Sequence, residues 1–173
     1  MLKVEEHKNV EKVIRYYISF LPPRGVESIL DIGCGITAPY SGMLKTRCKH
    51  YGSLDILEGP KVQYVYDLAK GTPFKNKEWE WGWCVEVLEH IDPILKEATV
   101  DEIMRICRNC VFTYPLPSFI NFADDPGHTE VKIDWNKFTK THTITNKTTK
   151  TGRAILILTE KNYKPYNYQS TLL

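Results

Sequence analysis

The stretch Ser28-Ile29-Leu30-Asp31-Ile32-Gly33-Cys34-Gly35 decides how the rest of the sequence is interpreted. A short apolar run that ends in two closely spaced glycines is typical of a buried strand that enters a tight turn. The residues that follow have a helical pattern over about 38–45. This region therefore predicts a strand, a glycine turn and a helix in succession.

The same alternation continues along the chain. We expect a helix at 95–108 and further strands at 51–56, 62–66, 81–85 and 110–114. Each expected strand is a nearly continuous apolar run, which is typical of a parallel sheet that is covered on both faces. Ligands bind at the carboxyl ends of the strands in such sheets. The central part of the chain thus predicts an α/β fold with its site at that edge.

The two ends of the chain have a different character. Residues 1–21 place apolar side chains at helical spacing up to Pro22-Pro23, which predicts an N-terminal helix that covers the sheet. The region after the last expected parallel strand predicts a loop, a short helix and an antiparallel hairpin, at 115–129, 134–139, 142–146 and 153–160. We expect the tail, 161–173, to be loosely held.

At 173 residues the chain has the length of one domain with a sizeable core. We expect a single domain over 1–173, with a cofactor-binding core at 28–114 and a substrate-side loop and hairpin at 115–160. The five cysteines are odd in number and predict free thiols rather than a disulfide framework. No stretch has the length of a membrane span, so we expect a soluble cytoplasmic protein with no membrane partner.

The formal net charge is only +2, so overall charge neither predicts nor excludes a polyanionic partner. Residues 132–164 nevertheless contain eight basic and two acidic side chains. Two interpretations of this basic C-terminal third remain open. It can be the solvated face of a hairpin, or a surface that attracts an anionic substrate.

Acidic residues follow the expected strands at the edge where a ligand would bind. Asp55 lies 24 positions after Asp31, which places a carboxylate where it can accept hydrogen bonds from both hydroxyls of a ribose. A pyrophosphate would require a third glycine, whereas this turn reads Gly-Cys-Gly-Ile-Thr-Ala, with Thr37 near the expected position. The pattern therefore predicts a cofactor that has a ribose and no phosphate.

At this point the sequence resembles the class I S-adenosylmethionine-dependent methyltransferases. Five segments carry the resemblance in family order, namely ILDIGCG (29–35), SLDI (53–56), DLAKGTPF (67–74), WCVEVLEHI (83–91) and VFTYP (111–115). The resemblance implies a Rossmann-like fold, with a seven-stranded and mostly parallel sheet and an antiparallel C-terminal strand. Because the connection before residue 62 is too short for a crossover helix, we expect a member with pared-down helices.

The resemblance also implies a role for each residue that matches a family motif. The group formed by Asp31, Gly33 and Gly35 would line the methionine and ribose part of S-adenosylmethionine. Asp55 would bind the ribose hydroxyls. The adenine ring would lie against Asp67 and Leu68, and the sulfonium would lie beside Val85 and Glu86.

A second group of residues points to the chemistry of the acceptor. Glu86, Glu89 and His90 have the spacing i, i+3 and i+4, which places them on one side of the chain if it turns helical, and His128 follows the fifth expected strand at the same edge. Two carboxylates and two imidazoles are a suitable ligand set for Mg²⁺, Mn²⁺ or Fe²⁺, which would lower the pKa of a bound hydroxyl. We therefore expect Glu86, Glu89, His90 and His128 to be both catalytic residues and metal ligands.

A narrower resemblance supports this expectation. The element EVLEH (86–90) is followed by a later histidine and by IDWNKF (133–138). This combination resembles the small-RNA 3′-terminal ribose 2′-O-methyltransferases. It is also similar to the ubiquinone-biosynthesis O-methyltransferases. Because the EVLEH element also occurs in methyltransferases without a metal, a second interpretation remains open, in which Glu86 faces the cofactor and His90 packs beneath a short helix.

These patterns together predict an S-adenosylmethionine-dependent O-methyltransferase that acts on a small molecule or on the ribose hydroxyl of an RNA end. We expect a monomer or a small homo-oligomer. Transfer to nitrogen or carbon is the nearest variant. The alternative from another class is a non-catalytic S-adenosylmethionine-binding module or partner subunit.

Overall fold

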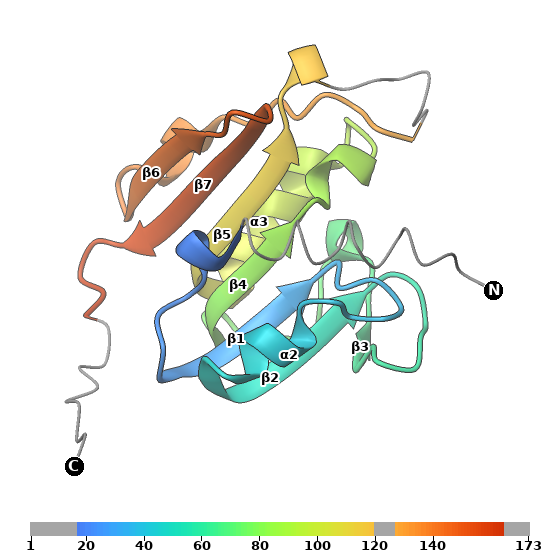
Figure 1. Cartoon of the computed structure of the whole chain (residues 1–173), viewed down its shortest axis with the longest axis vertical. Coiled ribbons are helices and arrows are strands. Elements are labelled where there is room, and N and C mark those ends of the chain that lie inside the picture. The colour runs from blue at the N-terminus through green and yellow to red at the C-terminus, as the bar shows by residue number, and fades with distance from the viewer. Residues whose placement is uncertain (1–16, 120–126, 165–173) are drawn as a thin grey trace.

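The computed structural model describes residues 17–119 and 127–164, and within them the chain forms one seven-stranded sheet (Figure 1). The strands are β1 (Val26–Ile32), β2 (Cys48–Asp55), β3 (Tyr64–Val65), β4 (Trp79–Val85), β5 (Cys107–Pro115), β6 (His142–Thr148) and β7 (Arg153–Glu160). Their order across the sheet is β3-β2-β1-β4-β5-β7-β6. The chain therefore crosses over between β3 and β4, from one half of the sheet to the other.

The directions of the strands confirm the expected topology. Strands β1 to β5 pair in parallel, whereas β7 is antiparallel to both of its neighbours, β5 and β6. The sheet is therefore mostly parallel with an antiparallel C-terminal strand, as predicted. Because the strand order reverses between β1 and β4, their carboxyl ends flank the crevice where α/β sheets bind ligands.

The helices in the described part of the chain are few and short, as predicted. The α-helices are α2 (Ser41–Lys45) and α3 (Lys96–Ile106). The remaining helical segments are 3₁₀ turns, η1 (Ile18–Phe20), η2 (Leu68–Lys70), η3 (Leu88–His90), η4 (Pro117–Phe119) and η5 (Trp135–Phe138). Only the last turn of the expected N-terminal helix, 1–21, lies within the described residues. The tail beyond residue 164 lies outside them.

Two apolar cores cover the two faces of the sheet, which lies between α3 on one side and α2 on the other (Figure 1). One face packs against α3 through Val100, Ile103 and Ile106, which are fully buried. The opposite face packs against α2 and the N-terminal segment, through Leu44 and Tyr17. Because both faces are covered, the residues that leave the core at the strand ends are the ones that can meet a ligand.

Two of the lysines in the basic C-terminal third are paired with nearby carboxylates. Lys132 lies 2.8 Å from Glu130, and Lys137 bridges Glu97 and Asp101 of α3, the latter at 2.6 Å. The positive charge of this region is therefore partly neutralised within the fold. In the part of the chain that the structure describes, no helix has the length and apolar character needed to span a membrane.

Candidate functional site

A pocket of about 350 Å³ opens at the carboxyl ends of the parallel strands. It is lined by residues at or just after the ends of four strands and by residues leading into and within α3, namely Gly33, Leu54, Asp55, Ile56, Tyr66, Asp67, Leu68, Ala69, Glu86, Val87, His90, Ile91, Asp92, Leu95 and Thr99. The volume lies within the range of pockets that hold small ligands and cofactors. The position of the pocket is the one expected from the strand order.

The turn after β1 requires its glycines for two different reasons. Gly33 and Gly35 have φ angles of +62° and +64°, in the left-handed region that glycine adopts at no steric cost. A Cβ on Gly33 would lie 2.5 Å from Cγ2 of Val87, whereas a Cβ on Gly35 would have no neighbour within 4 Å. The turn is therefore closely packed at Gly33 against Val87, in the loop that follows β4, whereas there is free space beside Gly35.

Asp55 holds the turn after β1 in place and also faces the pocket. Its Oδ2 accepts a hydrogen bond from the Gly35 N–H (2.8 Å), and its Oδ1 accepts one from the Leu57 N–H (2.9 Å). A carboxylate offers about four lone-pair directions. Two acceptor directions therefore remain for a ligand that donates hydrogen bonds from the pocket.

Asp67 and Leu68 line the pocket on the side of β3. The Asp67 carboxylate caps η2 by accepting a hydrogen bond from the Ala69 N–H (3.1 Å), and it lies 3.1 Å from the Lys70 ammonium. Leu68 is buried and packs with the core under α3. Five of the predicted cofactor residues therefore line one pocket, namely Gly33, Asp55, Asp67, Leu68 and Glu86.

Asp31, Gly35 and Val85 were also predicted as cofactor residues, but they do not line this pocket. Val85 packs in the core on the face of Tyr17. Asp31 is buried, and its Oδ2 accepts a hydrogen bond from the Tyr51 hydroxyl (2.9 Å). Burial raises the pKa of Asp31 to about 7, helped by the charge of Asp55 and opposed by the bond from Tyr51. Asp31 is thus tied to β2 through Tyr51, and Gly35 is tied to Asp55 through its N–H.

Glu86 leaves the end of β4 in a direction that its spacing did not predict. Its φ angle is +55°, a left-handed conformation that is uncommon for a residue with a side chain. Its Oε1 accepts hydrogen bonds from the hydroxyls of Tyr17 and Thr113, both at 2.9 Å, and its Oε2 accepts one from Nε of Arg153 (2.8 Å). The Glu86 carboxylate therefore forms an ion pair with Arg153, the first residue of β7.

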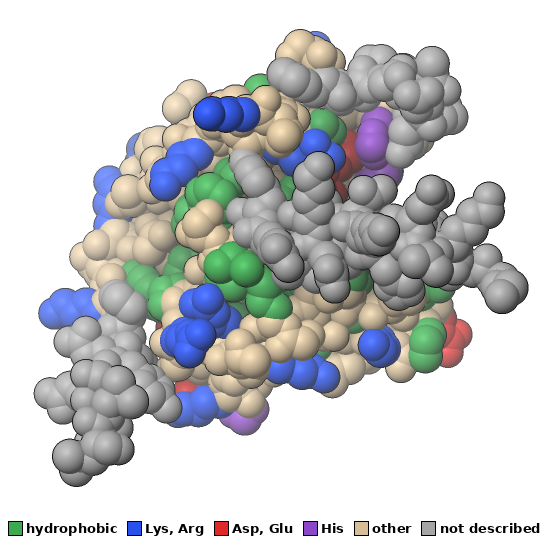
Figure 2. All heavy atoms as spheres, in the orientation of Figure 1, with side chains coloured by type: hydrophobic (Ala, Val, Ile, Leu, Met, Phe, Trp, Pro, Cys, Tyr) green, Lys and Arg blue, Asp and Glu red, His purple; other side chains and the backbone are tan. Residues whose placement is uncertain are grey.

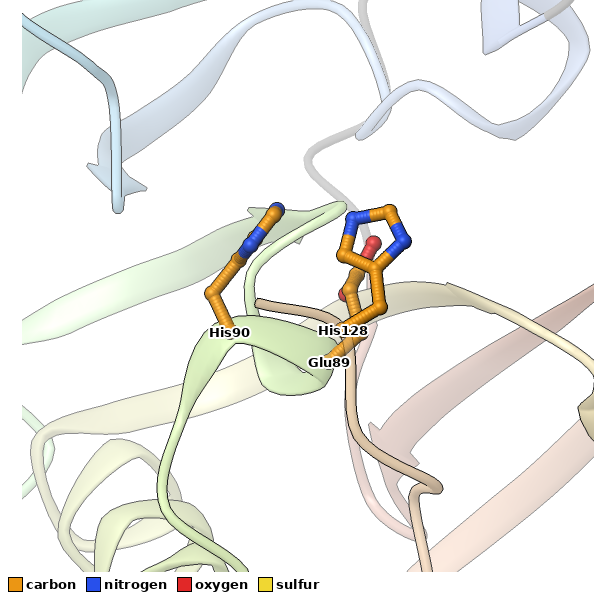
Figure 3. A group of neighbouring side chains, drawn as sticks. All are labelled: Glu89, His90 and His128. Carbon is orange, nitrogen blue, oxygen red and sulfur yellow. The ribbon is translucent and has the colours of Figure 1, made fainter. Parts of the chain in front are cut away.

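Glu89, His90 and His128 converge beside the pocket (Figure 3). One ligand atom from each of the three side chains lies within 4.8 Å of the others, and the two imidazole centroids are 4.5 Å apart. Figure 3 shows Glu89 and His90 on the turn after β4 and His128 on a separate segment. The structure thus brings together three of the four predicted metal ligands, whereas Glu86 lies outside this group and is paired with Arg153.

The Glu89 carboxylate is buried without a hydrogen-bond partner among the described residues. Burial, followed by the charge of Glu86, raises the pKa of Glu89 to about 8. A buried carboxylate is stable only with a proton or with a positive partner, because an isolated charge is costly to remove from water. Because Glu89 lies beside two imidazoles, a cation bound by all three side chains is one way to compensate the charge of its buried carboxylate.

Hydrogen bonds of Thr129 to Glu89 and to the buried Lys96 place His128 next to His90. The Thr129 N–H donates to the Glu89 carbonyl (2.7 Å), and the Lys96 ammonium donates to Thr129 Oγ1 (2.7 Å) and to the Thr129 and Glu130 carbonyls. Neither residue was predicted to matter, because a lysine on a helix and a threonine in a loop carry no such signal. The only hint in the sequence is that Thr129 directly follows a predicted ligand.

Comparisons with known proteins place the fold but not the activity. No protein-family model matches the sequence, and no curated protein sequence matches it. Among solved structures, a SAM dependent methyltransferase from Archaeoglobus fulgidus aligns over 87% of this chain and 93% of its own, with a TM-score of 0.67 at 16% identity. A putative methyltransferase of Haloferax volcanii, in complex with a methyltransferase activator, aligns over 91% and 93%, with a TM-score of 0.64 at 9% identity.

The small RNA methyltransferase HEN1 aligns over 92% of this chain and 26% of its own, with a TM-score of 0.57 at 13% identity. These alignments cover 87–92% of this chain. At such low identity they establish architecture rather than chemistry. The chain has the Rossmann-like fold of the class I S-adenosylmethionine-dependent methyltransferases.

Proposed function

We propose that this protein is an S-adenosylmethionine-dependent methyltransferase and that it methylates a hydroxyl group, on a small molecule or on the ribose of an RNA end. One observation carries the proposal. His90 lines the cofactor-sized pocket and also belongs to the Glu89–His90–His128 cluster. A bound cofactor and a cluster suited to activate an acceptor would thus lie side by side.

The lining of the pocket fits S-adenosylmethionine residue by residue. Gly33 lines the pocket at the first turn, where the methionine part would lie. Asp55 keeps two acceptor directions for the two ribose hydroxyls after its bonds to the Gly35 and Leu57 N–H groups. The adenine ring would lie against Leu68, next to the carboxylate of Asp67.

Methyl transfer from a sulfonium is an in-line displacement, so the protein must hold the acceptor oxygen about 3 Å from the methyl carbon and remove its proton. His90 and His128 each carry an imidazole nitrogen that can accept such a proton. The Glu86–Arg153 pair sits at the tip of β4 and holds the start of the turn that carries His90. The acceptor would therefore lie beside His90, where the pocket meets the Glu89–His90–His128 cluster.

The cluster also fits a divalent cation, because the buried Glu89 carboxylate has no other partner among the described residues. Glu89, His90 and His128 would hold the ion, and two imidazoles with one carboxylate favour Mn²⁺ or Fe²⁺ over Mg²⁺, which prefers an oxygen shell. Such an ion would lower the pKa of the acceptor hydroxyl. The resemblance of the sequence and the likeness of the fold to a small RNA methyltransferase support the RNA end as one acceptor class.

Calorimetry with S-adenosylmethionine tests the cofactor assignment. We expect binding with a dissociation constant in the micromolar range and a loss of at least about tenfold in Asp55→Ala, because both ribose acceptors disappear. Lys61→Ala, in the exposed connection between β2 and β3, is the matched control and should bind normally. Undetectable binding to the wild-type protein would overturn the proposal.

Release of S-adenosylhomocysteine with a panel of hydroxyl acceptors tests turnover. The alternative, a non-catalytic cofactor-binding module, predicts bound S-adenosylmethionine and no product. One structural neighbour is a putative methyltransferase in complex with a methyltransferase activator. The panel is therefore repeated with candidate partner proteins before the protein is concluded to lack turnover.

Calorimetric titration with Mn²⁺ tests the cation site without relying on activity. Glu89→Gln keeps the shape of the side chain and removes its charge, so we expect Mn²⁺ affinity to fall at least about tenfold. Glu86→Gln is the informative comparison, because Glu86 is tied to Arg153 and should contribute little to ion binding. Equal Mn²⁺ affinity in the wild type and in Glu89→Gln would remove the cation from the proposed mechanism.

A further inference from the structure

A second pocket lies at the edge of the sheet opposite the cofactor pocket. It has a volume of about 540 Å³ and is lined by residues near the start of β6, the end of β7 and the start of β4, namely Lys77, Lys140, Thr141, His142, Glu160, Lys161 and Asn162. Strand β7 runs from Arg153 at the catalytic edge to Glu160 here, about 23 Å at 3.3 Å per residue. A ligand in this pocket would therefore not touch the cofactor site.

Positive charge predominates in this pocket. Three lysines line it, against the single carboxylate of Glu160, which already lies 3.8 Å from Lys77 and 3.7 Å from Arg108. Figure 2 shows Lys and Arg side chains along this outer side of the molecule, next to β6 and β7. In contrast to Lys132 and Lys137, neither Lys140 nor Lys161 forms an ion pair within the described residues.

The position of Lys77 is fixed by the fold. Its φ angle is +56°, in the left-handed region, and its half-buried ammonium donates hydrogen bonds to the carbonyls of Met104 (2.7 Å) and Cys107 (3.0 Å). An ammonium has three N–H donors, so one remains for Glu160 or for a ligand in the pocket. Burial lowers the pKa of Lys77, and a neighbouring anion opposes that change. An anion in the pocket would thus meet a preorganised positive charge.

His142 supports this wall without adding a charge. Its side chain is buried, with Nε2 3.0 Å from the Arg108 carbonyl and Nδ1 2.8 Å from the Thr141 hydroxyl. Burial lowers the pKa of His142, so the ring is neutral near pH 7. The cations that a ligand would meet are therefore the fixed Lys77 and the two exposed lysines, Lys140 and Lys161.

We propose that this pocket binds a phosphate group of a small anionic ligand, with Lys77 as the fixed contact and Lys140 and Lys161 closing over it. Lysine is a common phosphate ligand because its ammonium acts as a compact point charge. The pocket is larger than a phosphate and has room for a nucleotide-sized anion. This second site is independent of the proposed methyl transfer, since it lies at the other end of β7.

Calorimetry with inorganic pyrophosphate at low salt tests the site. We expect one binding site in the wild-type protein and a loss of affinity of at least about tenfold in Lys140→Glu/Lys161→Glu. The matched control is Lys147→Glu/Lys150→Glu, which makes the same change of charge at the other end of the same hairpin and should alter affinity by less than about twofold. Adenosine monophosphate, as a second probe, distinguishes a free inorganic anion from a nucleotide as the preferred source of the phosphate.

Two outcomes would overturn the proposal. One is the lack of pyrophosphate binding to the wild type at low salt. The other is an equal loss of affinity in both double variants, which would indicate diffuse attraction along the hairpin. Binding of S-adenosylmethionine is measured in every variant to confirm the fold, and because it occurs at the other edge, it can fail or succeed independently of the phosphate site.

Discussion

Replacing Gly33 by alanine tests whether the first turn is held by close packing against the β4 loop. The φ angle of +62° costs an alanine about 1–2 kcal/mol. The new Cβ would lie 2.5 Å and 2.8 Å from the two methyl groups of Val87, an overlap that typically costs a further 1–3 kcal/mol, as an order of magnitude. We therefore expect Gly33→Ala to lower the free energy of unfolding by about 2–5 kcal/mol.

Gly35→Ala provides the matched control two residues away. Its φ angle is +64°, almost the same, but its Cβ would have no neighbour within 4 Å. Only the backbone cost of about 1–2 kcal/mol applies. The difference between the two variants isolates the contact with Val87, and Val87→Ala introduced into Gly33→Ala should recover about 1–3 kcal/mol of that difference.

Urea unfolding followed by tryptophan fluorescence measures the free energy of unfolding of the wild type, of the two glycine variants and of the Gly33→Ala/Val87→Ala double variant. The reasoning is refuted if the two glycine variants lose equal stability. It is also refuted if Val87→Ala adds its own cost to Gly33→Ala without any recovery.

Three further changes test other parts of the site. The pKa of Asp31 is raised from its usual 3.8 to about 7, so the unfolded chain loses this proton at a lower pH than the folded protein does. The free energy of unfolding should therefore fall as pH rises from about 4 to about 7, by at most about 4 kcal/mol. Urea titrations at several pH values should show a flatter dependence on pH for Asp31→Asn. Arg153→Met removes the ion partner of the partly buried Glu86 and should lower stability by about 1–3 kcal/mol, with a smaller loss when Glu86→Gln is combined with it. Lys96→Met releases the segment that carries His128 and should weaken Mn²⁺ binding at least about tenfold by calorimetry, while S-adenosylmethionine still binds.

The sheet could be predicted because each strand is a local apolar run and the strand order follows from the fold that the motifs resemble. The helix expected at 38–45 is shorter in the structure, where α2 begins at Ser41. Ala38 has a φ angle of +42° and precedes Pro39, and a residue before proline disfavours the right-handed helical conformation. The later start of this helix is therefore predictable from Pro39.

The site was less predictable where a side chain depends on a distant partner. The spacing of Glu86 and Glu89 suggested one shared ligand set, but Glu86 turns instead toward Arg153, which lies 67 positions later in the sequence. Similarly, Lys96 has the sequence character of a solvent-exposed helical lysine, yet its ammonium is buried against the Thr129 carbonyl. Such contacts depend on which loops meet at the sheet edge, and residue spacing within one segment does not contain that information.

The connection that carries His128 is anchored on both sides. The Leu116 N–H donates to the Gly152 carbonyl (2.8 Å) near its start, and the Thr129 N–H donates to the Glu89 carbonyl (2.7 Å) at its end. Because the second anchor lies one residue after His128, a change of chain length before residue 127 should leave the histidine in place, which makes this connection a suitable target for libraries of loop length in directed evolution.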